Sequence, residues 1–192
     1  MGPPPGTSDE AIVSAYLRTR DPELFRLLLE RNQDRVLRLV ASILGPFADL
    51  DAEEVAQEVF VRAHERLATF RGESRFSTWL HRLAYNRAIE LRRRARLRFQ
   101  HVACGDLQAG AARDGPHEAA LESEREHAVA RLVEELPDVY RAVVHLHYWM
   151  DQSMEEIAAT LDVPAGTVKS YLARARARMR ERAKARGIQG LE

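Results

Sequence analysis

Arginine and lysine side chains are concentrated in two segments of the sequence, residues 86–102 and 165–186. The first segment holds six arginines against one glutamate, and the second holds six arginines and two lysines against one glutamate. Guanidinium and ammonium groups neutralise the phosphates of nucleic acids, which supplies most non-specific affinity. The formal net charge of the whole chain is +0, because acidic stretches separate the two basic ones. The sequence therefore predicts polyanion contacts at two distinct places.

The second basic segment has the pattern of a recognition helix in a helix-turn-helix. A short helix at 154–161 and a turn at 162–164 precede it. Val168 and Leu172 lie four positions apart, so we expect them to face the core. The outward positions, which would meet bases and phosphates in the major groove, are Lys169, Ser170 and Arg174. Gly166–Thr167 opens the helix, where free N–H groups can bind a phosphate. A solvated basic face on an ordinary helical hairpin is the alternative.

An acidic segment without any basic residue, 49–60, precedes the first basic one. Its carboxylates belong to Asp49, Asp51, Glu53, Glu54 and Glu58. Val55 and Val59 open an inward-facing stripe, so the acids cover the outer side of a helix. Capping and the helix dipole explain acids in the first turn. Gln57 and Glu58 lie beyond that turn and are not explained by capping, so a solvated face and a protein-binding surface are both open there.

Helices must position these residues, because apolar side chains recur at helical spacing and no stretch sustains strand alternation. Asp21–Pro22 predicts a helix start, Gly45–Pro46 a stop, and Ser153–Glu156 a capping box. The expected helices cover approximately 10–19, 22–44, 51–67, 77–98, 117–136, 138–149, 154–161 and 165–186. We therefore predict an all-α fold with two small helical domains joined by a flexible linker.

The change of composition along the chain predicts the domain boundaries. Gly, Ala, Asp and Gln interrupt the helical pattern from about residue 100. The expected divisions are an N-terminal tail at 1–9, a first domain at 10–99, a linker at 100–122, a second domain at 123–186 and a C-terminal tail at 187–192.

Several classes of function are disfavoured by what the sequence lacks. No segment approaches the roughly 18 apolar residues of a membrane span, and the first residues lack a secretory pattern, so we expect a cytoplasmic protein. Cys104 is the single cysteine, which excludes an intrachain disulfide. The sequence has no phosphate-binding glycine loop, metal-ligand cluster or nucleophile elbow. We therefore predict no enzymatic activity, no catalytic residue, no metal and no cofactor.

Several motifs in order resemble those of the sigma-70 family of RNA polymerase sigma factors. Residues 136–137, 157–158, 166–170 and 174–176 are similar to the family's fourth conserved region. Residues 51–60 resemble its polymerase-binding helix, and 70–72, 76–80 and 83–86 resemble its promoter-melting segment. The similarity spans about residues 10–182. Because only the second and fourth regions are represented, the chain resembles the extracytoplasmic-function (ECF) group, whose members direct core polymerase to promoters.

The resemblance implies a role for each surface. The polymerase contacts, on a coiled coil of the β′ subunit, would be Asp51, Glu54, Gln57, Glu58 and Phe60. The −10 contacts would be Phe70, Arg71, Ser74, Asn86 and Arg87, with Arg92, Arg93, Arg94 and Arg96 following the phosphate backbone. The −35 contacts would be Gly166, Thr167, Lys169, Ser170, Tyr171, Arg174 and Arg176. The implied partners are the β and β′ subunits of core polymerase, promoter DNA and an anti-sigma factor.

Tyr171 departs from the family pattern, in which this position is usually arginine. A tyrosine cannot make the bidentate pair of arginine with guanine, so base preferences at −35 do not carry over. For Trp79 we favour core packing over lining the DNA surface, and for Phe76 likewise. A stand-alone helix-turn-helix regulator is the alternative function, but it leaves the acidic helix and the loop around Phe70 unexplained. A nuclease is a weaker alternative.

Overall fold

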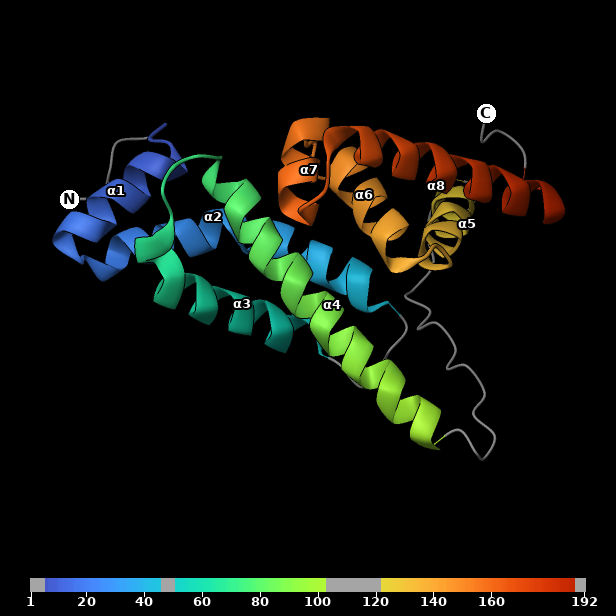
Figure 1. Ribbon diagram of the computed structural model, residues 1–192, viewed down its shortest axis with the longest axis horizontal. Helices are drawn as coiled ribbons and strands as arrows, with labels where there is room; N and C mark the ends of the chain where they lie inside the picture. The colour runs from blue at the N-terminus through green and yellow to red at the C-terminus, as the bar shows by residue number, and fades with distance from the viewer. Residues whose placement is uncertain (1–5, 46–50, 103–121, 189–192) are drawn as a thin grey trace.

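The computed structural model describes residues 6–45, 51–102 and 122–188. Within these ranges the chain forms helices and turns without a strand, which confirms the predicted all-α fold. The elements, drawn in Figure 1, are α1 (Asp9–Thr19), α2 (Pro22–Leu44), α3 (Ala52–Arg66), the short 3-10 helix η1 (Leu67–Thr69), α4 (Phe76–Val102), α5 (Glu122–Glu134), α6 (Asp138–Tyr148), α7 (Met154–Leu161) and α8 (Ala165–Ala185). Most of the predicted linker, with Cys104, lies outside the described residues.

Capping residues start the helices where the sequence predicts. Asp21–Pro22 caps and opens α2. Asp51 Oδ1 accepts a hydrogen bond from the Glu53 N–H at 2.8 Å, at the start of α3. At α7 the predicted capping box is complete, because Ser153 Oγ accepts from the Glu156 N–H at 3.1 Å while the Glu156 carboxylate accepts from the Ser153 N–H at 2.9 Å. Each such cap is worth about 1 kcal/mol.

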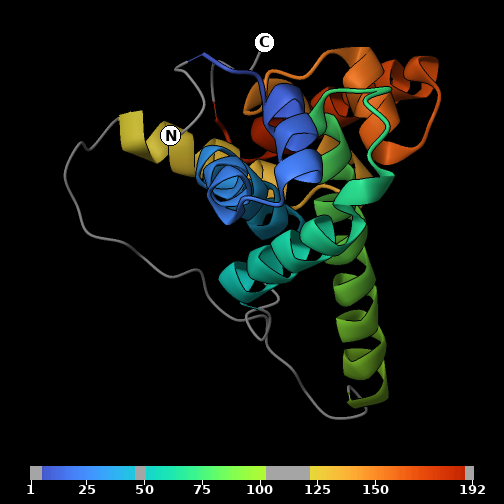
Figure 2. The same cartoon turned by 90° about the vertical axis from the view of Figure 1, so that its left-hand side faces the viewer.

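The first helical unit is built around α2, which contacts α1, α3 and α4. The apolar stripes of these helices meet in one core, so their polar faces are left outside. Its buried side chains include Ile12, Leu28, Val36, Leu39, Val55, Val59, Ala63, Phe76, Leu80 and Ala84. Figure 2 shows α3 crossing α4, so each helix keeps one free surface. The inward stripe predicted for α3 is confirmed.

The second helical unit consists of α5 to α8 and contains the predicted helix-turn-helix. Asp162, in the left-handed conformation at φ 59°, ends α7, and Pro164 precedes α8. The core between them is formed by Leu146, Ile157, Leu161, Val168, Leu172 and Ala175. The inward orientation predicted for Val168 and Leu172 is therefore confirmed, and the opposite face of α8 is free.

The two units pack against each other along a seam that the sequence did not predict, with α2 contacting α6 and α4 contacting α7. Three charged side chains meet there. Asp138 Oδ1 lies 3.0 Å from Arg92 Nη2 and 3.7 Å from Arg141 Nη2. Arg92 and Arg141 are 4% and 2% exposed. Buried guanidinium groups are tolerated only when paired, so this carboxylate is central to the seam.

Two carbonyl oxygens at the end of α2 also accept hydrogen bonds from Arg92 and Arg141. Arg141 Nη1 donates to the Ser42 carbonyl at 3.2 Å, and Arg92 Nη1 donates to the Ile43 carbonyl. These are C-terminal carbonyls, which carry the negative end of the helix dipole. Gly45 ends α2 at φ +58°, and a Cβ there would collide with the Arg141 guanidinium. Both the positive φ and the close approach of Arg141 therefore favour glycine at this position.

A second polar contact crosses the seam between α4 and the residues before α7. The Gln152 side-chain amide donates to His81 Nδ1 at 2.6 Å. Burial, with the positive charge of Arg35, lowers the pKa of His81 to about 4. The His81 imidazole is therefore neutral at physiological pH. At the edge of the seam, Arg82 and Asp162 form an exposed ion pair at 3.0 Å.

Candidate nucleic-acid interfaces and protein-docking surface

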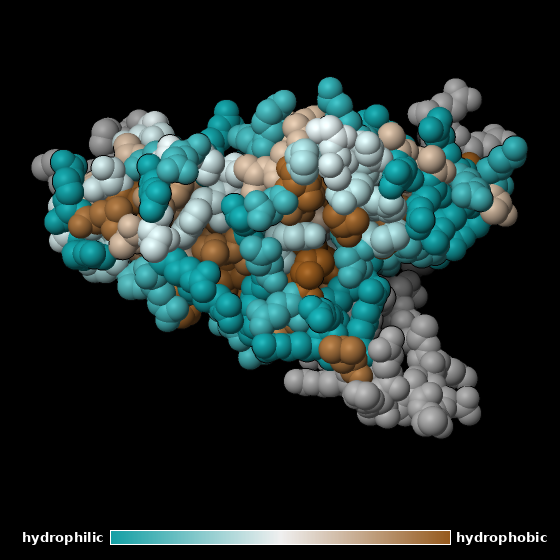
Figure 3. Space-filling view, viewed as in Figure 1, coloured by the Kyte–Doolittle hydropathy of each residue, from teal (hydrophilic) through white to brown (hydrophobic). Residues whose placement is uncertain are grey.

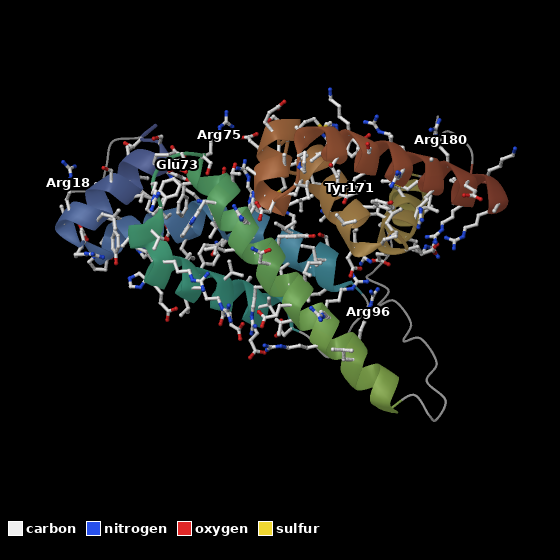
Figure 4. The ribbon with its side chains drawn as sticks, in the orientation of Figure 1. Arg18, Glu73, Arg75, Arg96, Tyr171 and Arg180 are labelled. Carbon is white, nitrogen blue, oxygen red and sulfur yellow. The ribbon has the colours of Figure 1, made fainter. Side chains whose placement is uncertain are left out.

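The exposed face of α8 carries the cations predicted for the −35 contact. Lys169, Ser170 and Arg174 are exposed, while the residues beside them on the other face are buried. Figure 4 shows side chains projecting from α8 into solvent, Arg180 among them. Ser170 Oγ donates to the Gly166 carbonyl at 3.1 Å, which leaves the hydroxyl oxygen able to accept. This face presents donors at the spacing that a helix in the major groove requires.

The N-terminus of α8 is open to close approach. Gly166 is exposed, and a Cβ added there would meet no atom within 4 Å. Packing within the chain therefore does not require glycine at this position. Thr167 is half-buried, and its N–H donates to the Pro164 carbonyl at 2.9 Å. The first two N–H groups of the helix, those of Ala165 and Gly166, are the ones placed to meet a phosphate.

Two residues predicted for the −35 contact are engaged by tyrosines of α6. The half-buried ring of Tyr171 packs against Tyr140, with ring centroids 5.6 Å apart. Arg176 Nε donates to the Tyr148 hydroxyl at 2.8 Å, and its guanidinium lies 5.6 Å from that ring centroid. Tyr171 (labelled in Figure 4) is therefore partly covered by α6, whereas Arg174 one turn further along α8 is exposed. Neither pair could be predicted from sequence patterns, because each joins separate helices.

The loop between η1 and α4 has an anchored start and an exposed tip. Phe70 is half-buried and packs against Phe76 and Trp79, at centroid distances of 5.8 and 5.6 Å. Arg71 and Gly72 are exposed, and Gly72 takes the left-handed φ of +72° that glycine tolerates best. Ser74, the other predicted −10 contact in this loop, is half-buried. Phe76 is buried as predicted, whereas Trp79 keeps part of its ring exposed.

Neighbouring residues of α4 have very different environments. Asn86 is exposed. The Arg87 side chain is only 10% exposed, and its Nε donates to Glu58 Oε2 at 2.6 Å. Arg87 Nη1 also donates to Glu90 Oε2 at 3.2 Å. Arg87 and Glu58, predicted to bind DNA and polymerase respectively, thus bind each other. The separation of 29 residues between them hides this pair from sequence patterns.

The predicted stripe of phosphate-binding arginines on α4 is incomplete. Arg93, Arg94 and Arg96 are exposed. Arg92 is buried in the seam with Asp138, so the prediction that it follows a phosphate backbone is wrong for this arrangement of the chain. The basic pattern in the sequence could not separate a core guanidinium from three solvated ones.

The predicted polymerase-binding helix borders an apolar groove between α2 and α3. The groove has a volume of about 720 Å³, and its lining includes Phe25, Leu29, Leu37, Ala56, Gln57, Phe60 and Val61. Val61 is 60% exposed and Phe60 is 8% exposed, so one forms the rim and the other the floor. Asp51, Glu54 and Gln57 are exposed, and Glu58 is half-exposed. Figure 3 shows brown apolar patches interrupting the hydrophilic surface of the molecule. An apolar groove edged by acids and amides suits an amphipathic, basic partner.

The chain is similar in sequence to two family models and to known proteins. Residues 28–98 match the model of Sigma-70 region 2, and residues 126–179 match Sigma-70, region 4. The ECF RNA polymerase sigma-E factor of Escherichia coli (strain K12) is 34% identical over 177 residues, which cover 88% of this chain and 91% of that protein. The ECF RNA polymerase sigma factor SigW of Bacillus subtilis (strain 168) is 31% identical over 169 residues, covering 84% and 89%.

Two solved structures share the fold at 22% identity, each with a TM-score of 0.66. One is CnrH in complex with the cytosolic domain of CnrY, which covers 93% of this chain and 99% of that chain. The other is the sigma factor RpoE in complex with the anti-sigma factor NepR from Bartonella quintana, covering 83% and 96%. The matched regions, the identity to the ECF relatives and the helix-turn-helix together show that this chain belongs to the ECF group of the sigma-70 family and functions as an RNA polymerase sigma factor.

Proposed function

We propose that three surfaces divide the work of initiation in this sigma factor. Residues 10–99 hold core polymerase and the −10 element, and residues 123–186 hold the −35 element. The observation that carries this proposal is that Gln57, beside the α2–α3 groove, is open to solvent while Lys169 and Arg174 are open on α8. A protein-docking surface and a DNA-reading surface are therefore available at the same time.

The polymerase contact is assigned to the α2–α3 groove. Basic and polar groups of a β′ helix would meet Gln57 and Glu58, and an apolar side chain of that helix would pack on Val61 and Phe60. Burying an exposed valine contributes about 1.5 kcal/mol or more, whereas surface ion pairs contribute at most about 1 kcal/mol each. The apolar groove would therefore supply affinity, and the acids would supply orientation and specificity. The β subunit is the second polymerase partner.

The −10 contact is assigned to the loop at Phe70–Ser74 and to Asn86. Extruding a base costs a few kcal/mol, and stacking with edge contacts must offset that cost at roughly 1–3 kcal/mol per base. Phe70 anchors the start of the loop through its ring contacts with Phe76 and Trp79. Exposed Arg71 supplies a planar cation, and the exposed amide of Asn86 can both donate and accept.

The −35 contact is assigned to the exposed face of α8. Lys169 and Arg174 would reach base edges or phosphates, with Ser170 and the Gly166–Thr167 backbone positioning the helix. Arg176, held by Tyr148, would meet the flanking phosphates. Tyr171 packs on α6 in this arrangement, so a base contact from it would require its ring to leave Tyr140.

Binding both elements at once requires the two units to separate. The names of the elements place them about 25 base pairs apart, roughly 85 Å of duplex at about 3.4 Å per pair. In the structure α7 packs directly on α4, and the 21 residues of α8 span only about 32 Å. The seam must therefore open when both DNA surfaces are engaged.

An anti-sigma factor and a cytoplasmic site of action complete the proposal. The RpoE structure that shares this fold contains an anti-sigma factor, which supports a partner of that class here. No helix in the described ranges is long and apolar enough to cross a membrane. Initiation in this scheme uses binding energy and the chemistry of the polymerase, so no catalytic group of the chain is required.

Run-off transcription with purified core polymerase and a promoter library tests the proposal. We expect transcripts that require both this chain and a template with two spaced elements. The matched control is the chain with Val61→Asp, which places a charge on the rim of the docking groove and should abolish stimulation. Failure of the native chain to stimulate any template, or specific operator binding by a dimer without polymerase, would refute the proposal.

A further inference from the structure

The N-terminus of α4 is capped by an acid from another helix. The Phe76 N–H donates to Glu10 Oε1 at 2.8 Å, although 66 residues separate the two. Phe76 is the first residue of α4, so its N–H has no partner within the helix. The residue in the cap position is Arg75, whose cationic side chain has no acceptor. Helix α1 therefore provides the capping acceptor that the residues just before α4 lack.

Helix α1 holds Glu10 on a fixed platform. Asp9 Oδ2 accepts from Asn32 Nδ2 at 2.9 Å, and Asp9 Oδ1 accepts from Arg31 Nη1 at 3.1 Å. These bonds tie the first turn of α1 to the middle of α2. Ile12 and Val13 are buried in the shared core at 0% and 2% exposure. The carboxylate that caps α4 is thus positioned by the rigid part of the first helical unit.

The charge of Glu10 suits this role. Burial alone would raise the pKa of the Glu10 carboxyl, but hydrogen bonds from the Phe76 and Glu10 N–H groups and from Ser8, with the nearby cation of Arg75, lower it overall. The group is therefore ionised at neutral pH. A carboxylate at the positive end of a helix dipole makes a charge-assisted bond, which is stronger than a neutral one.

This cap lies at one end of the exposed −10 loop. At the other end, Phe70 is held by its ring contacts with Phe76 and Trp79. The tip between them, including Arg71 and Gly72, is exposed. A shift in the first turn of α4 would displace this tip relative to Asn86 further along the same helix. Positioning errors of about 1 Å are enough to weaken such sites.

We infer that Glu10 is a positioning residue for −10 recognition, acting through the first turn of α4. Glu10 precedes the span matched by the region 2 model, which begins at residue 28. The inference rests on the proposed function of the loop. It adds that α1 holds the first turn of α4, and with it the end of the loop, in place. Glu10 itself touches neither DNA nor polymerase in this scheme.

The test compares Glu10→Ala and Glu10→Gln with Glu23→Ala, which removes an exposed acid from the first turn of α2. Holoenzyme is assembled with each variant, and binding is measured to single-stranded −10 oligonucleotides with each base changed in turn. Glu10→Ala should weaken binding to the preferred oligonucleotide about fivefold, the scale of a lost helix cap, and should flatten the base preferences. Glu10→Gln keeps the acceptor and should fall between Glu10→Ala and the native chain. Glu23→Ala should match the native chain.

Three controls separate the outcomes. Core polymerase affinity, −35 duplex binding by the free chain and the melting temperature should change little in Glu10→Gln. Unchanged −10 binding and base preferences in Glu10→Ala would overturn the inference. Equal losses in −10, −35 and polymerase binding for both variants would also overturn it, because they would show a general folding role. Absence of −10 binding by the native holoenzyme would instead refute the proposed function.

Discussion

Replacing Asp138 by alanine should open the seam between the two helical units. Asp138 lies in the first turn of α6, and its Oδ1 is 3.0 Å from Arg92 on α4 and 3.7 Å from Arg141 on α6. Arg96 is a further neighbour at 3.6 Å. Burial and repulsion from Arg141 lower the pKa of Arg92 to about 10, although the Asp138 carboxylate opposes both effects. Without the carboxylate, two buried cations would face each other.

The size of the effect follows from the exposure of the three groups. Removing one partner of a fully buried ion pair costs about 3–5 kcal/mol. The Asp138 side chain is 22% exposed, and the Arg92 and Arg141 side chains are 5% and 2% exposed. Both arginines also keep their carbonyl partners at the end of α2. A cost of about 2–3 kcal/mol is therefore expected, which shifts the open-to-closed ratio about 30- to 140-fold.

This cost should appear in domain docking and not in the folding of either unit, because separation returns Arg92 to water. Small-angle scattering measures the result directly. A compact chain of this length has a radius of gyration of about 16 Å, and Asp138→Ala should exceed the native value. Arg82→Ala is the matched control, because its ion pair with Asp162 crosses the same seam with side chains 45% and 78% exposed and should contribute little.

Two results would refute the reasoning about Asp138. A radius of gyration and thermal stability equal to those of the native chain would show that the buried cations do not need the carboxylate. Equal opening by Arg82→Ala would show that burial is not what makes Asp138 important. Polymerase-dependent transcription should persist in Asp138→Ala, since the seam opens when both promoter elements are bound.

Three further predictions follow from single groups. Burial lowers the pKa values of His81 and His145 to about 4, below the unfolded value near 6.5. The unfolded chain then binds more protons between these values, so stability should fall as pH drops from about 6.5 to 4, by up to about 3 kcal/mol per histidine; a flat denaturation profile over this range would contradict burial of neutral imidazoles. Arg174→Ala should weaken −35 duplex binding by about 1–3 kcal/mol, measured by fluorescence anisotropy, whereas Lys184→Ala near the end of α8 should change it less; equal losses would remove the assignment. Val61→Asp should lower core polymerase affinity at least tenfold in a competition assay, because burying a charge against a partner is costly. Its thermal stability should be unchanged, because Val61 is 60% exposed in the free chain.

Local chemistry explains how much of the fold could be predicted. Ser153 and Glu156 are three residues apart and satisfy each other's backbone donors, so the start of α7 is encoded in four residues. The inward pair Val168 and Leu172 likewise fixes which face of α8 is free, because helical periodicity leaves no other choice. The fold class and the exposed face of α8 could therefore be derived from the sequence alone.

The seam could not be derived in this way, because its partners are distant in sequence. Arg92 belongs to a run of arginines that share the same local pattern, and only its burial against Asp138 of another unit distinguishes it. Glu10 gives no local sign of capping α4, since the N–H it accepts from belongs to a residue 66 positions away. Electrostatic partners are chosen by tertiary packing, which composition and spacing do not encode.

Asn86 and Arg87 show the same limit inside the DNA-binding site. Helical geometry turns adjacent side chains about 100° apart, and here Asn86 is exposed while Arg87 pairs with Glu58 of α3. Arg87 is 10% exposed and bound to Glu58 and Glu90, so a phosphate contact would have to replace two ion pairs already formed. The net contribution of Arg87 to DNA affinity is the gain from a phosphate contact minus the loss of two ion pairs, and it should be small because the two are similar. Asn86 is exposed and has no such pair to break, so the −10 contact of α4 rests on it.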